Sequence, residues 1–233
     1  MQIKPQIRIS LVAIVLVLLA VFIQNNSALN SGNAISNFQP QPRYDTIVIY
    51  PVFTELAYQK NGFYDYYSKA CDTKCLVVRY HSPNYNNMAA SRAAYNFFNT
   101  HGYTIVSDMI VTDHPEILKL YRTVIVLHNE YVSQKEFDAI TNHTHVLYLY
   151  PNALYAEVEY DKDTSSIYLV KGHGWPSDIK NGFGWVDDNS KYESDKKCDN
   201  WKIIPAHNGI MISCYPEYII SGDDRLTKLI MEY

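Results

Sequence analysis

Residues 123–150 read TVIVLHNEYVSQKEFDAITNHTHVLYLY, and this stretch decides the fold that we expect. It contains two apolar runs typical of buried strands, Thr123–His128 and His145–Tyr150. Between them, Ser133 and Glu136 have the spacing of a capping box, which predicts a helix over Ser133–Asn142. Two strands joined by one helix predict a parallel βαβ unit.

The same alternation extends toward the N-terminus. Thr46–Val52 is a β-branched run that predicts a buried strand, whereas residues 53–86 look irregular and aromatic. Asn87–His101 is rich in helix formers, Thr104–Ser107 predicts a strand, and Asp113 is expected to cap the helix that follows it. This order predicts an α/β fold with a flavodoxin-like doubly wound, mostly parallel sheet.

The alternation of predicted strands and helices ends after Asn152. Ala156–Tyr160 and Ser166–Lys171 are expected to form a hairpin, and a long loop with Gly and Trp residues follows. Asn208–Cys214 predicts a last strand, and Asp223–Met231 predicts a closing helix. We therefore expect a C-terminal β extension beside the α/β core.

The N-terminus carries a strongly apolar segment, Ile9–Ile23, in which Ser10 is the only polar residue. As a helix it would cover about 22 Å, short of the roughly 30 Å of a bilayer core unless its flanks contribute. Such a segment is either a cleaved signal peptide or an uncleaved anchor. The residues around Ala28 make a poor cleavage site, and Gln24–Pro42 is uncharged and polar like a flexible stalk, so we favour the anchor.

The positive charges before the apolar segment are expected to stay in the cytoplasm, and the rest of the chain to be exported. The predicted organisation is a cytoplasmic N-terminus at 1–8 with Lys4 and Arg8, a transmembrane signal anchor at 9–25, a flexible stalk at 26–43 and an extracytoplasmic α/β domain at 44–233.

Four cysteines agree with export, because an even number in an exported chain suggests disulfides. Three pairings are possible, and we expect Cys71 to pair with Cys75 and Cys198 with Cys214. The close spacing of the first pair also suits a metal, but no second pair with that spacing accompanies it.

Composition limits the classes of partner. The net charge is −4 and the chain has no Lys/Arg run, which argues against a nucleic-acid ligand. Tyrosine is unusually frequent, at 21 of 233 residues. Tyrosines suit half-buried sheet edges, and they also suit a surface for a carbohydrate, a metal or a protein partner.

Candidate site residues follow from the expected sheet, since ligands of open α/β sheets bind beyond the carboxyl ends of the strands. The first place is the turn from His128 to Tyr131, which holds Glu130. The others are the loop with His173 and Trp175, and Tyr85 ahead of a predicted helix. The residues of this turn can also be explained by structural roles alone. In this explanation Glu130 caps the next helix, while Tyr131 packs on the sheet and His128 makes a buried hydrogen bond.

The segment Asn99–Ala139 carries a motif order of its own. Gly102-Tyr103 follows a helix, a short strand ends at Asp108, Tyr121 precedes the next strand, and that strand ends in His128-Asn129-Glu130-Tyr131. In this order the segment resembles the large-subunit domain of N,N-dimethylformamidase-type proteins, within the class I glutamine-amidotransferase-like group. The next strand, with Pro151-Asn152 at its end, is similar as well.

The resemblance implies a specific departure from amidotransferase chemistry. Amidotransferases of this group carry a nucleophilic cysteine at the strand-to-helix elbow, where this chain has Asn129-Glu130. Attack by a thiolate is therefore not expected. Formamidase-like members hold iron through tyrosine and glutamate, which would make Tyr131 and Tyr85 the candidate metal ligands here. The sequence does not identify the glutamate.

Our leading expectation is a membrane-anchored, extracytoplasmic amidotransferase-like module without the catalytic cysteine, which binds a protein, glycan or envelope ligand and needs no cofactor. The alternative is a metal-assisted hydrolase of small amides, with iron implied by the resemblance. The ligand-binding candidates are Tyr85, Tyr131, His173 and Trp175, and the catalytic candidates are His128 and Glu130.

Overall fold

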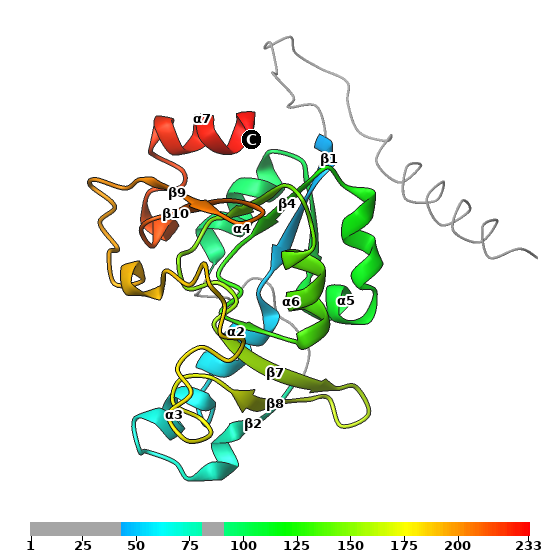
Figure 1. Ribbon diagram of the computed structural model, residues 1–233, viewed down its shortest axis with the longest axis vertical. Coiled ribbons are helices and arrows are strands. Elements are labelled where there is room, and N and C mark those ends of the chain that lie inside the picture. Colours follow the sequence, from blue (N-terminus) through cyan, green and yellow to red (C-terminus); the bar gives the residue numbers. More distant parts are fainter. Residues whose placement is uncertain (1–42, 81–90) are drawn as a thin grey trace, which may run out of the picture. The chain divides into compact units, whose positions relative to one another are not determined.

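The computed structural model describes residues 43–80 and 91–233 (Figure 1). The predicted N-terminus at 1–8, anchor at 9–25 and stalk up to residue 42 lie outside the described residues, as does Tyr85. In the described ranges, no helix combines the length and the apolar composition needed to cross a membrane.

Six strands of the described chain form the main sheet, in the order β3-β1-β4-β6-β10-β9. All neighbours are parallel except the last pair, β10 and β9. The mixed α/β fold with a mostly parallel sheet is thus confirmed. The strands are β1 (Arg43–Tyr50), β3 (Tyr103–Ser107), β4 (Thr123–Val126), β6 (Val146–Tyr148), β9 (Ile203–Ala206) and β10 (Gly209–Ile212).

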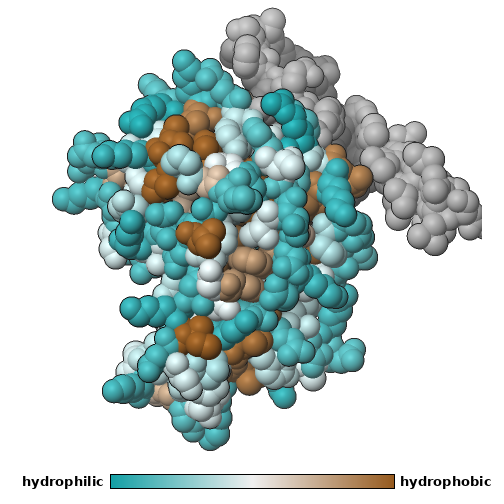
Figure 2. Space-filling view, viewed as in Figure 1, coloured by the Kyte–Doolittle hydropathy of each residue, from teal (hydrophilic) through white to brown (hydrophobic). Residues whose placement is uncertain are grey.

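Helices cover both faces of this sheet. Val48 and Ile125 belong to the core shared with α4 (Arg92–Thr100) and α7 (Asp224–Glu232). Their neighbours in the strands, such as Val124, belong to a second core on the other face, shared with α5 (Asp108–Asp113) and α6 (Gln134–Thr141). Because both faces of the central strands are buried, these strands read as continuous apolar runs without alternation. On the outer surface seen in Figure 2, apolar side chains form small patches among polar ones.

A second sheet lies beside the end of the main sheet, in the lower part of Figure 1. Its order is β2-β8-β7-β5, with the strands β2 (Val77–Arg79), β5 (Tyr131–Val132), β7 (Ala156–Asp161) and β8 (Ser166–Lys171). The predicted hairpin is confirmed as β7 and β8. The expected C-terminal β extension is therefore divided: the hairpin belongs to the second sheet, and β9 and β10 widen the main sheet.

Two expectations from the sequence are wrong. The segment that looked irregular contains most of α2 (Val52–Tyr58), which takes the last residue of the predicted strand, and all of α3 (Phe63–Tyr67). Both helices start without a capping side chain and so lack the usual signal. The helix expected after Asp113 is present as the 3-10 helix η3 (Pro115–Leu120), but its N-cap is His114, and Asp113 is the last residue of α5. Ser107 caps α5 by accepting a hydrogen bond from the Ile110 N–H, and Asp113 forms an ion pair with Lys162.

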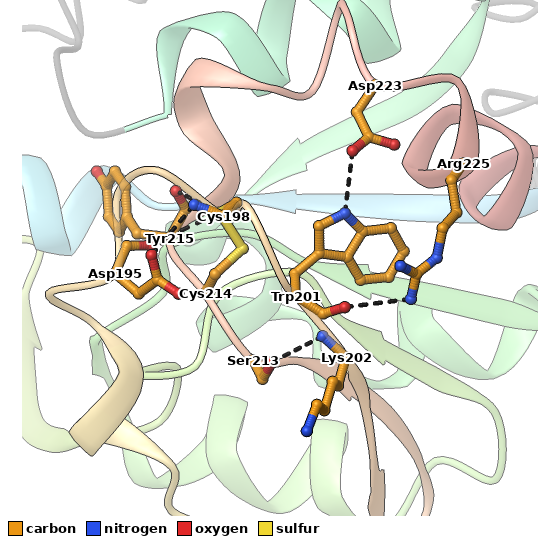
Figure 3. Close-up of a disulfide and its surroundings, with 9 residues drawn as sticks. All are labelled: Asp195, Cys198, Trp201, Lys202, Ser213, Cys214, Tyr215, Asp223 and Arg225. Carbon is orange, nitrogen blue, oxygen red and sulfur yellow. Dashed lines mark hydrogen bonds between the residues drawn. A yellow bond between two sulfur atoms is a disulfide. The ribbon is translucent and has the colours of Figure 1, made fainter.

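Both expected disulfides are present, Cys71–Cys75 and Cys198–Cys214. Figure 3 shows the second one beside Trp201, whose indole N–H donates to Asp223 at 3.1 Å. The Arg225 guanidinium lies 3.8 Å from the centre of the Trp201 ring. Two disulfides in a small domain are typical of an oxidising compartment outside the cytoplasm.

Gly209 provides a test of the sheet order. A Cβ atom at this position in β10 would lie 1.8 Å from the Val146 carbonyl oxygen in β6. We expect Gly209→Ala to lower the free energy of unfolding by about 2–4 kcal/mol, because β10 must move away from β6. Gly222→Ala is the matched control, since no atom lies within 4 Å of its Cβ position. Urea denaturation of both variants measures the difference, and equal effects would contradict the pairing.

Candidate functional site

The turn after β4 lies at the carboxyl end of that strand and leads directly into β5. Backbone hydrogen bonds hold it: the Asn129 carbonyl accepts from Leu154, and the Glu130 carbonyl accepts from Tyr155 and Ala156. The turn is closed to solvent, with His128 at 3% exposure and Glu130 at 0%. The chain thus carries a carboxylate into the boundary between the two sheets.

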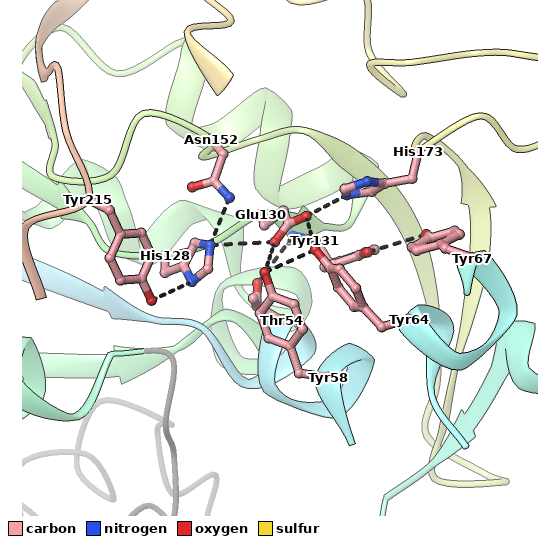
Figure 4. Close-up of polar contacts among 10 residues, drawn as sticks. All are labelled: Thr54, Tyr58, Tyr64, Tyr67, His128, Glu130, Tyr131, Asn152, His173 and Tyr215. Atoms are coloured by element: carbon pink, nitrogen blue, oxygen red, sulfur yellow. Dashed lines mark hydrogen bonds and ion pairs between the residues drawn. The ribbon is translucent and has the colours of Figure 1, made fainter. Parts of the chain in front are cut away.

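Four side chains surround the Glu130 carboxylate (Figure 4). The Tyr58 hydroxyl donates to Oε2 at 2.5 Å, and the Tyr64 hydroxyl donates to Oε1 at 2.9 Å. His173 forms an ion pair with Oε1, and Nε2 of His128 lies 3.4 Å from Oε2. The two imidazoles approach the carboxylate from opposite sides. Side chains of α2, α3, the β4 turn and the loop after β8 therefore meet at one anion.

The electrostatics of this Glu130 cluster (Glu130, Tyr58, Tyr64, His128 and His173) follow from burial and hydrogen bonding. Burial alone would raise the pKa of Glu130, but hydrogen bonds from His128 and His173 and their charge outweigh it and hold this pKa well below its usual range. Burial, with the charge of Glu130 added, raises the pKa of the Tyr58 and Tyr64 hydroxyls. The carboxyl is therefore ionised, and both phenols keep their protons and donate them.

His128 is held in turn by a further layer. Its Nε2 lies 2.8 Å from Nδ2 of Asn152, its Nδ1 lies 3.5 Å from the Tyr215 hydroxyl, and its ring stacks on Tyr150. Asn152 is only 3% exposed, and its Oδ1 has no hydrogen-bond partner. A buried amide with one end unsatisfied points to a group that a ligand would provide.

Two buried acids, Asp108 and Glu136, lie close to the turn and hydrogen-bond to residues in and beside it. Asp108 accepts a hydrogen bond from the Phe53 N–H at 2.8 Å, and Glu136 lies 3.4 Å from Nδ2 of Asn129. Burial raises the pKa of both carboxyls, and the charge of Asp108 adds to the effect on Glu136. Ser133 caps α6 as predicted, since its Oγ accepts from the Glu136 N–H, but the Glu136 carboxylate contacts Asn129 and does not complete the capping box. These acids fix the backbone and do not reach the pocket.

A pocket of about 890 Å³ opens above the Glu130 cluster. It is lined by three tyrosines, the His128–Asn152 pair and a mixed polar rim: Glu55, Tyr58, Gln59, Tyr64, His128, Asn152, Glu193, Ser194, Lys196 and Tyr215. A second pocket of about 580 Å³ has His173 in its wall. The two histidines that contact Glu130 thus belong to two different pockets.

The structure brings together three of the residues predicted for the site: His128, Glu130 and His173. Tyr131 is fully buried, with its hydroxyl 3.3 Å from that of Tyr67, so it supports the cluster from behind. Trp175 packs edge-on against Tyr66 and does not contact Glu130. The structural interpretation of the turn is wrong in one respect, because Ser133 caps α6 and Glu130 does not.

The sequence analysis missed Tyr58 and Tyr64, because it predicted no helix in residues 53–86, where α2 and α3 direct these side chains to the turn. The signal was the density of tyrosines in this segment, from Tyr58 to Tyr67. Asn152 was noticed only as the end of a strand.

Within the described residues, no group of three or more His, Cys, Asp or Glu side chains is arranged to hold a metal ion. Comparison with known proteins gives no relative from which a function could be transferred: no known family matches the chain, and no curated protein is significantly similar to it.

The Glu130 cluster makes a prediction for stability. Glu130→Gln should lower the free energy of unfolding at neutral pH by about 3–5 kcal/mol, because it removes one partner of a buried ion pair. Since the folded-state pKa of Glu130 is lowered, its contribution is present above about pH 4.3, the ordinary value, and disappears as the pH falls below it.

The difference between wild type and Glu130→Gln should therefore shrink in acid, which urea denaturation at a series of pH values measures. Glu159→Gln is the control, as Glu159 is an exposed carboxylate on β7. A constant difference at all pH values would show that Glu130 is not ionised in the folded protein.

Proposed function

We propose that this chain is an extracytoplasmic ligand-binding module that holds a small glycan in the pocket above the Glu130 cluster. We further propose that it is anchored in the membrane through residues 9–25. The strand order in the main sheet begins with β3-β1-β4-β6, the order expected of a flavodoxin-like doubly wound sheet. In such sheets ligands bind beyond the carboxyl ends of the strands, which is where the pocket lies.

One observation carries the proposal: the elbow position holds a carboxylate whose oxygens are already engaged by four side chains. A carboxylate whose two oxygens are both engaged in hydrogen bonds and ion pairs is a poor nucleophile or base. No thiol can replace it, because all four cysteines are in disulfides. We therefore assign Glu130 a structural role: it holds the side chains beneath the pocket in place, and the pocket itself is available for binding.

The pocket wall suits a sugar. Its volume lies in the range of small-molecule sites, and a concave site favours a small ligand over a flat protein surface. The tyrosine rings offer apolar faces for the C–H groups of a sugar ring. A hydroxyl group both donates and accepts, so it can satisfy the unpaired end of the buried Asn152 amide.

Binding of monosaccharides and disaccharides to the full-length protein in detergent, measured by calorimetry, tests the proposal. We expect Asn152→Leu to weaken binding of the best saccharide by about tenfold, the effect of one lost hydrogen bond to a buried group. Asn99→Leu is the control, because Asn99 is exposed on α4. Failure of every saccharide to bind would refute the proposed function, and saccharide hydrolysis by the wild type would refute the absence of catalysis.

A second function, metal-assisted hydrolysis of small amides, is favoured by one feature of the Glu130 cluster. The Tyr58 and Tyr64 hydroxyls lie 3.0 Å from each other and each lies within 2.9 Å of a Glu130 oxygen. Two phenols and a carboxylate at such spacing are a ligand set for a hard cation such as iron. Tyr58, Tyr64 and Glu130 would hold the ion, in place of the predicted pair Tyr85 and Tyr131, and it would polarise an amide carbonyl.

Metal analysis of the purified protein distinguishes the two functions. If the second function holds, iron binds at about one ion per chain and gives a visible tyrosinate-to-iron band, because the two phenols would bind the metal as phenolates and release their protons to the solvent. Tyr58→Phe should then shift or abolish the band, whereas Tyr192→Phe, at an exposed tyrosine, should not. Iron-free protein that also fails to take up added iron would reject this function.

A further inference from the structure

Two carboxylates in the pocket wall, those of Glu55 and Glu193, narrow the class of ligand. Lys196 and His128 are the basic residues of the lining, and Arg92 is close enough to Glu55 to lower its pKa. Burial outweighs Arg92 and raises the pKa of Glu55 to about 7, and burial raises the pKa of Glu193 as well. Above pH 7 the wall therefore carries an ionised Glu55 that lies in a partly buried position.

An acceptor atom at the pocket lacks a donor: Oε2 of Glu55 is buried without a hydrogen-bond partner. A buried carboxylate oxygen without a partner is costly, and a donor brought by the ligand would remove that cost. An ammonium group carries three donors and a positive charge, so it suits the Glu55 carboxylate.

The aromatic wall favours the same kind of group. The rings of Tyr58 and Tyr64 lie 4.3 Å apart, and the Tyr215 ring packs on the far side of His128 at 5.1 Å. Tyr58 remains 40% exposed although its hydroxyl is engaged with Glu130, so a ligand can reach its ring. Cations bind the faces of such rings through the ring quadrupole.

From these three observations we infer that the pocket selects glycans that carry a protonated amine, with Glu55 and Glu193 as its counter-charges and the tyrosine rings as its wall. This inference rests on the proposed glycan-binding function and adds the chemistry of the ligand. It assigns roles to Glu55 and Glu193 that the Glu130 cluster does not use.

A matched pair of probes tests it: 2-aminoethyl glucoside and 2-hydroxyethyl glucoside, which differ in one amine. Calorimetry uses the full-length protein in detergent at about pH 8, where an alkylamine is still protonated and Glu55 is ionised. We expect the amine to bind about tenfold more tightly than the alcohol. Glu55→Gln and Glu193→Gln should each reduce the ratio of the two affinities by about threefold or more.

Two control variants show whether the preference for the amine depends on the pocket residues themselves. Glu159→Gln removes one carboxylate outside this pocket and should keep the preference, which excludes an effect of net charge alone. Tyr215→Phe retains the ring and should keep the preference, whereas Tyr215→Leu should reduce it. A thermal unfolding curve for each variant shows that it is folded.

The outcomes separate the inference from the proposed function. Equal binding of the two glucosides overturns the selection for amines and leaves glycan binding in place. A preference that survives the double variant Glu55→Gln/Glu193→Gln also overturns it, because the counter-charges are then elsewhere. Failure of both glucosides, together with failure of every other saccharide, overturns the proposed function and the inference with it.

Discussion

The structure depends on one buried anion, the carboxylate of Glu130. A charge in a protein interior is tolerated only when donors replace its hydration, and here they come from segments far apart in the chain: Tyr58 and Tyr64 near the start of the domain, and His173 after the hairpin. Each donor has to reach the same two oxygens. The requirement therefore fixes where α2, α3 and the second sheet lie against the end of the main sheet.

The abundance of tyrosine has the same origin. A phenol offers an apolar ring for packing and one donor at its end, which suits a boundary that must be dry and also neutralise a carboxylate. The expected explanation by half-buried sheet edges does not apply to Tyr58 and Tyr64, which lie on the helices α2 and α3. Their rings are part of the pocket wall while their hydroxyls donate to Glu130.

The sequence predicted best what is decided locally. Strands β4 and β6 and helix α6 are marked by apolar runs and the spacing of a capping box, and both disulfides join cysteines close in sequence. The predictions from the sequence were wrong or incomplete where contacts between residues far apart in the chain determine the structure. Helix α2 begins after Pro51 without a capping side chain, and it is held by burial of residues such as Phe53. The turn with Glu130 was predicted as a site from its place at a strand end, but its donors could not be, because no local pattern connects Tyr58 with residue 130.

Strand β5 follows the Glu130 turn at once, so the chain leaves one sheet and enters the other within a few residues. His128 lies in the turn after β4 of the first sheet and His173 in the loop after β8 of the second, and both contact the same carboxylate. A displacement of the sheets by more than the length of a hydrogen bond would leave a bare charge in an apolar boundary. The two sheets are consequently held together at this carboxylate, and a ligand of the proposed kind would meet a preformed site whose shape does not depend on closure around it.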